Sequence, residues 1–294
     1  MPNKLRISSP WSQFSIFLVI GFASFFVFFF VENLVVQVTG INPVPSEKAL
    51  MDIHYIDVSK VIQVLFSVLV FGLTGYYYAR VTFWQHPLLE LGFRRPSRPS
   101  FYPVAILLLI VSFPLEEWLG EFNKRIPLAQ WMLDTEKAND RMVEALIKIH
   151  HPIDPYINVM VMAVIPAVCE EICFRGGLQR IMIRICRSPL AGIVLSAFLF
   201  SFLHLEFEGF LPRMFLGILL GAAYWYSGSL WVPILAHLFF NASQIIVAMT
   251  NPAVITGTPS IPFLFVLLSI VIVVGLLYWM RSRSNATYAA VYES

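Results

Sequence analysis

Long apolar stretches are the feature of this sequence that most limits its fold. Of the 294 residues, 58% are hydrophobic and 13% are charged, and the mean hydropathy is +0.73. Such values lie outside the range of ordinary soluble domains. Windows of about 20 apolar residues, enough for a helix to cross a bilayer, predict roughly eight spans, at 12–36, 60–82, 101–121, 156–180, 189–206, 209–228, 231–250 and 260–281. We therefore expect an all-α, polytopic transmembrane helical bundle with the lipid bilayer as its surroundings.

The positions of the basic residues predict how these spans are oriented. Four groups of Lys and Arg alternate with loops that carry fewer positive charges: Lys4 and Arg6; Arg80, Arg94, Arg95 and Arg98; Arg180, Arg184 and Arg187; Arg281 and Arg283. Because short cytoplasmic loops carry an excess of Lys and Arg, both termini are predicted to be cytoplasmic. The C-terminal Ala-Val-Tyr-Glu-Ser contains no organelle-retention signal, and we expect a bacterial plasma (inner) membrane.

Composition along the chain predicts four segments. They are an N-terminal scaffold of transmembrane helices (1–125), an extramembrane amphipathic connection (126–155), a catalytic helical core (156–250) and a last transmembrane helix with a cytoplasmic tail (251–294). Within the connection, Met142, Leu146 and Ile149 recur at helical spacing among charged residues of the segment Leu133–Ile149. This pattern predicts either an amphipathic helix on the membrane surface or a solvated connecting helix.

Two adjacent carboxylates lie inside the fourth apolar stretch. An ionisable side chain near the middle of a spanning helix costs about 2.5–3.5 kcal/mol, so Glu170 and Glu171 need a physical reason. Arg175 follows Glu171 at i,i+4 and can pair with it on one helix face. Glu170 points about 100° away from that face and has no local partner.

Two further spans carry polar side chains among apolar ones. His204 follows Phe200 in the pattern F-x-x-x-H, and His237 precedes Asn241 in the pattern H-x-x-x-N, which stacks both side chains on one face. A carboxylate in a pocket of low dielectric gains basicity and can act as a general base. A histidine beside it can hold or deprotonate water, and a second histidine and an amide can donate hydrogen bonds to an oxyanion. Together these groups are what water-mediated amide hydrolysis requires.

Each of these elements also has a purely structural interpretation. Glu171 and Arg175 can form an intrahelical ion pair with no further role. His204 taken alone, or His237 with Asn241, can be a polar contact between helices. The occurrence of all of them on three separate spans favours one shared catalytic site. Counting along the expected spans, however, puts Glu170 in the cytoplasmic half of its helix and His204 near the outer end of the next.

The sequence lacks the residue patterns that several other classes of protease require. All five aspartates lie outside the expected spans, which argues against an intramembrane aspartyl protease, and neither H-E-x-x-H nor G-x-S-x-G occurs. The three cysteines, Cys169, Cys173 and Cys186, cluster in or beside one span, so a secreted disulfide framework is excluded. Cys169 and Cys173 could serve as a nucleophile or soft-metal ligands, but small buried hydrophobic residues are the simpler interpretation.

The order E-E-x-x-x-R, F-x-x-x-H and H-x-x-x-N resembles the CPBP family of intramembrane glutamic endopeptidases, relatives of the type II CAAX prenyl protease and of bacterial abortive-infection proteins. Gly217-x-x-x-Gly221 and the stretch from Tyr226 to Trp231 also look like the family's linker, and the similarity covers about residues 155–250. The resemblance implies that Glu170 is the catalytic base, that His204 helps to activate water, and that His237 and Asn241 form the oxyanion site. Phe200, Glu171 and Arg175 would support them.

The resemblance also implies a substrate, a membrane-bound or lipidated peptide cleaved near its C-terminus. We expect no cofactor, no metal and no nucleic-acid partner. Two alternatives stay open: a zinc-dependent membrane protease in which Glu170, His204 and His237 are ligands, and a non-enzymatic membrane scaffold or immunity protein that keeps the motifs to hold its helices together.

Overall fold

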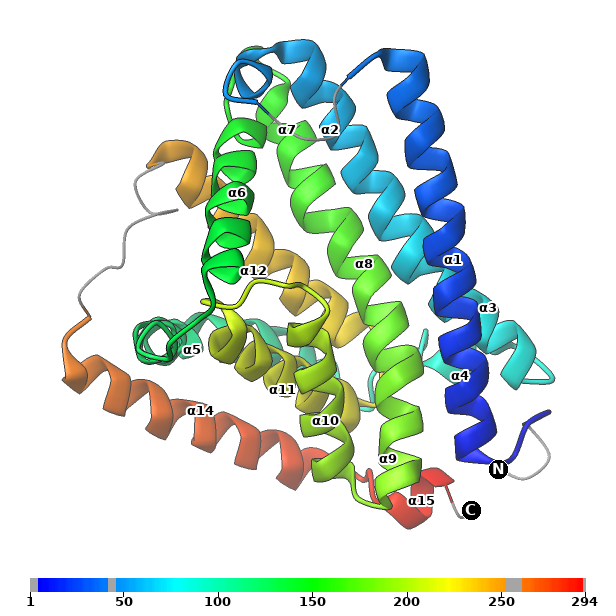
Figure 1. The fold of residues 1–294 in the computed structure, drawn as a ribbon. Coiled ribbons are helices and arrows are strands. Elements are labelled where there is room, and N and C mark those ends of the chain that lie inside the picture. The colour runs from blue at the N-terminus through cyan, green and yellow to red at the C-terminus, as the bar shows by residue number, and fades with distance from the viewer. Residues whose placement is uncertain (1–4, 42–45, 252–260, 293–294) are drawn as a thin grey trace.

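Helices make up the described part of this computed structural model, which comprises residues 5–41, 46–251 and 261–292 (Figure 1). The only β-type contact in these ranges is an isolated bridge between Leu5 and Phe83, so the predicted all-α fold is confirmed. The α-helices are α1 (Pro10–Thr39), α2 (Ile53–Phe66), α3 (Leu73–Thr82), α4 (Pro87–Leu91), α5 (Phe101–Asn123), α6 (Gln130–Leu146), α7 (Asp154–Val159), α8 (Ile165–Glu171), α9 (Arg180–Cys186), α10 (Pro189–Phe202), α11 (Phe210–Ser227), α12 (Trp231–Thr250), α14 (Phe263–Arg283) and α15 (Tyr288–Tyr292). Four short elements complete them: the 3₁₀ turn η2 (Ala49–Met51) and the π-helical stretches η3 (Ser67–Gly72), η4 (Met160–Val164) and η5 (Ile172–Gln179).

Six helices in the described ranges are long and apolar enough to cross a membrane. They are Pro10–Thr39, Ile53–Thr82, Phe101–Asn123, Asp154–Cys186, Trp231–Thr250 and Phe263–Arg283. The other two expected spans correspond to α10, which has 14 residues, and α11, which has 18; neither is among the six. A multi-pass helical bundle is therefore observed, and a total of eight spans stays a prediction.

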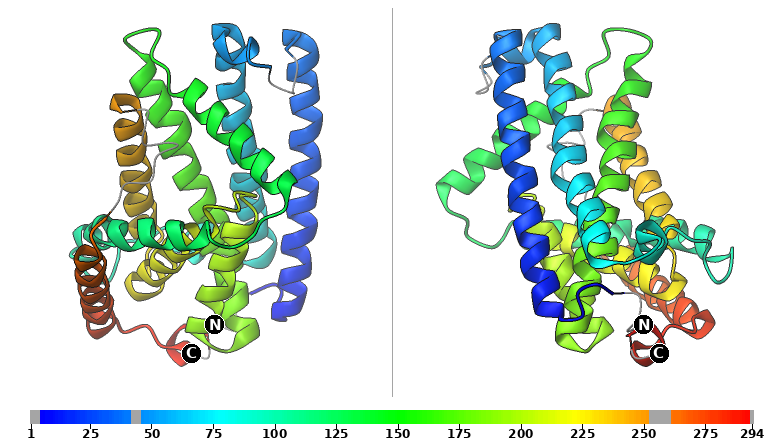
Figure 2. Two further views of the ribbon diagram at one scale, coloured as in Figure 1. Left: turned by 60° about the vertical axis from the view of Figure 1, so that its left-hand side comes forward. Right: turned by 90° about the vertical axis from the view of Figure 1, so that its right-hand side faces the viewer.

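The helix Asp154–Cys186, which joins α7 to α9 without a break, is the centre of the bundle. More than half of its most apolar window, 56%, is buried, against 17% for α1 and 22% for α14. Figures 1 and 2 show α1 and α2 packed along one side of it, with α10, α11 and α12 on the other. The apolar side chains that α1 and α14 expose suit contact with lipid, whereas the central helix is mostly surrounded by protein.

Both ends of the described chain lie at the C-terminal end of α9 (Figure 2). Arg184 donates a hydrogen bond to the carbonyl of Ser8, and Ile183 packs with Tyr292 of α15. The two ends of the described chain therefore lie at one end of the bundle. That this end is cytoplasmic stays a prediction, and Lys4, one of the charges behind it, lies outside the described residues.

The connection between α9 and α10 is a tight hairpin. Arg187 ends α9 with a positive φ of 51°. Ser188 then caps α10 by accepting a hydrogen bond from the backbone N–H of Ala191, and Pro189 occupies the first turn, where its missing N–H costs nothing. At Gly192 the two helices meet so closely that an added Cβ would lie 2.4 Å from the backbone nitrogen of Ile183. Only glycine permits this approach, so Gly192 fixes how α10 lies against α9.

The predicted helix in the 126–155 connection exists as α6. Leu146 and Ala145 are buried and pack with Met142 against Ile56 of α2. Ile149, which was expected on the same face, lies beyond the end of the helix and is 52% exposed. The helix is thus amphipathic and packs against the bundle through its C-terminal turns. The assignment of four segments to separate roles stays a prediction.

Candidate functional site

Two helices, α8 and α12, and the turn that follows α10 bring Glu170, His237 and His204 together around one carboxylate. Glu170 lies near the end of α8 and is only 8% exposed. Its Oε1 is 3.9 Å from Nε2 of His204, and its Oε2 is 3.9 Å from Nε2 of His237. Both separations exceed a direct hydrogen bond. The carboxylate therefore faces two imidazole edges across gaps that a small polar molecule can bridge.

Helix length explains how Glu170 and His204 meet. The fourth span was expected to end near residue 180, but the helix continues to Cys186 before the hairpin. Glu170 lies 16 residues before Cys186, and His204 lies 15 residues after Pro189. Since α9 and α10 run antiparallel from this hairpin, the two residues reach nearly the same height. The expectation that simple counting separates them is wrong because the end of the fourth helix was placed too early.

Glu171 occupies a separate and fully buried position on the other face. Its Oε1 lies 2.9 Å from a guanidinium nitrogen of Arg175, which confirms the predicted i,i+4 ion pair. The Arg175 guanidinium also donates to the carbonyl of Gly217 over 3.2 Å and lies 4.7 Å from the ring centre of Phe200. A buried charge needs such partners. This cluster accounts for Glu171 and Arg175 and leaves Glu170 outside it.

Hydrogen bonds to Nδ1 fix the tautomers of both histidines. Nδ1 of His237 lies 3.0 Å from Oε1 of Glu171, and Nδ1 of His204 lies 2.6 Å from the carbonyl oxygen of Phe200. A carboxylate and a carbonyl only accept hydrogen bonds, so Nδ1 carries the proton in each ring. In the neutral rings Nε2 is then a lone pair, and both lone pairs are directed at Glu170. The site thus presents hydrogen-bond acceptors around a shared space.

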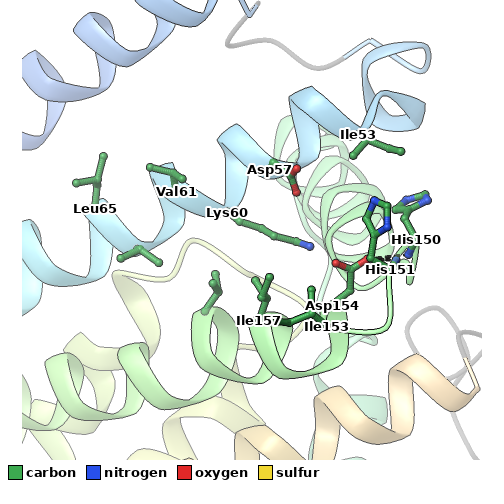
Figure 3. Close-up of a pocket in the computed structure, with 12 residues that line it drawn as sticks. Ile53, Asp57, Lys60, Val61, Leu65, His150, His151, Ile153, Asp154 and Ile157 are labelled. Atoms are coloured by element: carbon green, nitrogen blue, oxygen red, sulfur yellow. Dashed lines mark hydrogen bonds between the residues drawn. The ribbon is translucent and has the colours of Figure 1, made fainter.

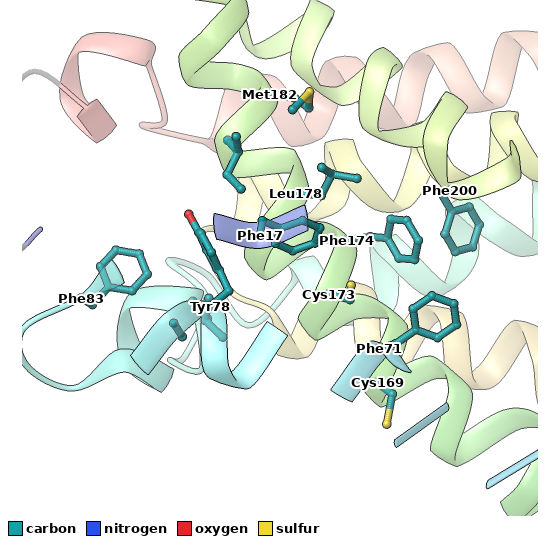
Figure 4. Close-up of a cluster of buried hydrophobic side chains, with 13 residues drawn as sticks. Phe17, Phe71, Tyr78, Phe83, Cys169, Cys173, Phe174, Leu178, Met182 and Phe200 are labelled. Carbon is teal, nitrogen blue, oxygen red and sulfur yellow. The ribbon is translucent and has the colours of Figure 1, made fainter. Parts of the chain in front are cut away.

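Phe200 supports this arrangement by packing. It is 2% exposed, and its ring lies 4.6 Å from the ring of His204 and 6.3 Å from that of His237. Figure 4 shows Phe200 beside Phe174 in the buried cluster under the site. The ring therefore fills the space between the two imidazoles and the guanidinium of Arg175.

Asn241 lies one helical turn beyond His237 on α12, as the spacing predicts. Its side chain is half-buried and makes no hydrogen bond to another residue in the described ranges. An amide without a protein partner keeps its two N–H donors available for another molecule. Asn241 therefore lies on the same face of α12 as His237, and its amide donors have no protein partner in the described ranges.

The loop that carries His204 is tied down by residues that the sequence reasoning missed. Asn123, at the end of α5, donates to the carbonyl of Phe207 over 2.7 Å and accepts from the N–H of Leu211 over 3.1 Å. Leu205, next to His204, adopts a positive φ of 54°. A non-glycine residue holds that conformation only when its surroundings impose it. Nothing in the local sequence links Asn123 to a loop more than 80 residues away.

Helix α6 holds the same loop from a second side. Oε2 of Glu136 accepts from the backbone N–H groups of Phe207, over 2.8 Å, and Glu208, over 3.3 Å. Trp131 packs edge-on against Phe207 with ring centres 5.3 Å apart. Burial raises the pKa of the nearby Asp140 carboxyl, and the charges of Glu136 and Glu208 raise it further. The connection helix therefore contributes directly to the position of the loop.

Arg213 of α11 is a further charge near the site. It forms an ion pair with Glu206 of the loop, and its guanidinium lies over Gly209, where an added Cβ would be 3.4 Å from a guanidinium nitrogen. Sequence reasoning overlooked it because it stands at the start of an apolar segment next to acidic residues. Its seven-residue spacing from Glu206 across a helix start was the one available signal.

Two further candidates from the sequence are the cysteines and a metal-binding cluster. Cys169 and Cys173 are free, buried and packed in the apolar cluster of Figure 4, which confirms their interpretation as small hydrophobic residues. In the described ranges no group of three or more His, Cys, Asp or Glu side chains is arranged to hold a metal ion.

Part of the chain matches the model of a known protein family. The model described as Rce1-like, type II CAAX prenyl endopeptidase Rce1-like, matches residues 152–243. Neither the curated proteins nor the solved structures gave a match. The matched segment contains Glu170, His204 and His237, which converge in space, and it also contains Asn241.

Proposed function

We propose that this multi-pass membrane protein, whose residues 152–243 match the Rce1-like model of type II CAAX prenyl endopeptidases, is an intramembrane glutamic endopeptidase. The reaction is hydrolysis of a peptide bond, with Glu170 as the general base on water. One observation carries the proposal: the two oxygens of a single buried carboxylate each lie 3.9 Å from a histidine Nε2. This leaves space for a water molecule that touches both kinds of group.

The tautomers indicate how such a water is held. With Nδ1 protonated, Nε2 of His204 accepts a hydrogen bond and so does the Glu170 carboxylate. A water between them donates one O–H to each, which directs its oxygen lone pairs outward to a scissile carbonyl. As the oxygen attacks the carbonyl carbon, Glu170 takes the proton and later gives it to the leaving amine.

Stabilisation of the oxyanion is assigned to Asn241 and His237. The amide of Asn241 has free N–H donors. His237 donates from Nε2 only as an imidazolium, and the Glu171 carboxylate at 3.0 Å from Nδ1 is placed to stabilise that charge. Arg175 holds Glu171 in turn. Glu171 and Arg175 thus act through His237 and have no direct contact with substrate in this mechanism.

The substrate we propose is a peptide held at the membrane, with a lipidated C-terminal segment as the family description implies. A bilayer-embedded site favours such a substrate because the lipid anchor brings the peptide to the depth of Glu170. We further propose that the chain acts in a bacterial inner membrane with both termini cytoplasmic.

The decisive experiment compares two glutamate variants. Glu170→Gln keeps the size of the side chain but removes its basicity, and loss of a general base lowers turnover by about 10²–10⁴-fold. Glu32→Gln, also a glutamate in an apolar span but on α1, is the matched control and should cleave a prenylated, membrane-anchored reporter peptide normally. Both proteins should show the same melting midpoint. Full activity of Glu170→Gln refutes the proposal. Activity that depends on stoichiometric bound zinc and disappears on chelation would identify the protein as a metalloprotease.

A further inference from the structure

An open pocket with a mainly apolar lining lies away from Glu170, between the first turns of α2 and the start of α7 (Figure 3). Its volume is about 520 Å³. Charged and imidazole side chains line it near the helix ends, among them Asp57, His151 and Asp154, while Val61, Leu65 and other aliphatic side chains line its deeper part. Polarity therefore changes along the pocket from the helix ends toward the middle of the bundle.

Lys60 is the buried lysine among the residues that line this pocket. Its side chain comes from α2 and points into the pocket in Figure 3, and the residue is only 6% exposed. Its ammonium forms no direct hydrogen bond or ion pair with another residue in the described ranges. The carboxylate of Asp154 interacts with it electrostatically, but no ion pair links the two. The ammonium thus keeps its N–H donors available to an anion inside the pocket.

Asp154 offsets the charge of Lys60 without a direct ion pair. Its Oδ2 already accepts hydrogen bonds from the backbone N–H groups of His150 and His151, at 2.7 and 2.8 Å. These bonds cap the chain where it enters the central helix and hold the carboxylate at the pocket wall. Asp154 therefore has a structural task, and Lys60 retains unused donors.

The charges are ordered along α2. Lys60 lies seven residues after the first residue of the helix, Ile53, or roughly 10 Å along the axis. Asp57 stands one turn closer to the helix end and is exposed, and Val61 and Leu65 lie on the deeper side. From the helix end inward α2 thus presents an anion, then a cation, then an apolar wall, while the start of α7 adds the carboxylate of Asp154.

The order of charged and apolar groups along α2 is complementary to that of an aminophospholipid. Such a lipid places its ammonium outermost, its phosphate next and its acyl chains innermost, with spacings of a few ångströms between the charges. We propose that the pocket binds a zwitterionic glycerophospholipid with a primary amine in its headgroup, as in phosphatidylethanolamine. The phosphate pairs with Lys60, the ammonium donates to Asp57, and an acyl chain follows Val61 and Leu65.

The proposal separates three lipids with identical acyl chains. Phosphatidylcholine carries the same charges, but its methylated ammonium has no N–H to donate to Asp57. Phosphatidylglycerol offers the phosphate without the ammonium and brings a net negative charge beside two aspartates. Phosphatidylethanolamine is therefore expected to bind the most tightly.

The test is lipid binding by native mass spectrometry of the purified full-length protein in detergent, titrated with each of the three lipids. We expect Lys60→Met to weaken phosphatidylethanolamine binding at least tenfold, while Lys48→Met, an exposed lysine outside the pocket, changes nothing. Asp57→Asn should reduce the preference for phosphatidylethanolamine over phosphatidylcholine at least threefold.

Asp57 is exposed, so its variant tests the idea even when Lys60→Met fails to fold. Equal binding of the three lipids by the unaltered protein overturns the proposal, as does an unchanged lipid preference in Asp57→Asn. Unchanged affinity in a folded Lys60→Met also overturns it. Cleavage by the Glu170 site is a separate readout, so failure here leaves the proposed peptidase function standing.

Discussion

Replacing Asn123 by alanine tests whether the loop that carries His204 must be held from outside. Asn123 is 2% exposed and bonds both to the carbonyl of Phe207 and to the N–H of Leu211. Those two bonds bracket the turn between α10 and α11. Asn123→Ala removes both and adds no bulk, so its effect on His204 comes from the loss of the bonds.

The expected size follows from the groups left unpaired. A buried backbone donor or acceptor without a partner costs about 1–3 kcal/mol. Water can reach part of this loop, because Leu205 is 52% exposed, so the lower half of that range applies to each group. The two groups together give about 2–4 kcal/mol. If this whole free energy acts on the loop, the population with His204 in place drops by about 30–700-fold, since about 1.4 kcal/mol corresponds to a factor of ten.

The assay is cleavage of the reporter peptide with kcat and KM determined separately, alongside the melting midpoint. We expect kcat to fall by at least tenfold and KM to change little, because the loop positions a catalytic group and no substrate-binding group. Gln130→Ala is the control, since it removes an exposed side-chain hydrogen bond to Asp134 on α6. A lowered melting midpoint with unchanged kcat would show that the bonds stabilise the fold but do not position His204.

Two other substitutions test the supporting structure. Glu171→Gln leaves the Arg175 guanidinium buried without its counter-charge. The free energy of unfolding should fall by about 3–5 kcal/mol, which lowers the melting midpoint well below that of the control variant Glu144→Gln on α6. Equal melting midpoints for the two variants would contradict the buried ion pair. Gly192→Ala places a Cβ 2.4 Å from the backbone of Ile183 and should destabilise the protein by at least about 1–3 kcal/mol. Gly275→Ala on α14 meets no atom within 4 Å and should be neutral or slightly stabilising, so similar melting curves for the two variants would rule out the tight α9–α10 contact.

Local spacing predicted the parts of the site that depend on one helix. The i,i+4 relation between Glu171 and Arg175 gave their ion pair, and the same geometry left Glu170 on another face. Asn241 follows His237 by one turn for the same reason. These relations follow from the regular rotation per residue of a helix, and the Glu171–Arg175 contact is made although Arg175 lies in the π-helical stretch η5.

Contacts between residues of different helices were harder to predict from the sequence. The meeting of Glu170 with His204 depends on where α9 ends, and an apolar window cannot locate that end because Arg180 and Arg184 look like loop residues. In the structure Arg180 is buried and bonds the hydroxyl of Tyr224 over 3.3 Å. A partner 44 residues away thus lets the helix continue through a charged stretch. The contacts of Asn123 and Glu136 with the loop were not predicted for the same reason, because tertiary packing determines their partners.

The two adjacent glutamates show how one helix can give identical side chains opposite tasks. A rotation of about 100° turns Glu171 toward Arg175 and Nδ1 of His237, both of which contact its Oε1. The same rotation turns Glu170 toward two Nε2 atoms that offer lone pairs and no guanidinium. If Arg175 reached Glu170 as closely, that carboxylate would be stabilised as an anion and would be a weaker base. The ion pair therefore serves the proposed reaction by keeping the arginine bound to the other glutamate, which explains why a membrane helix carries both.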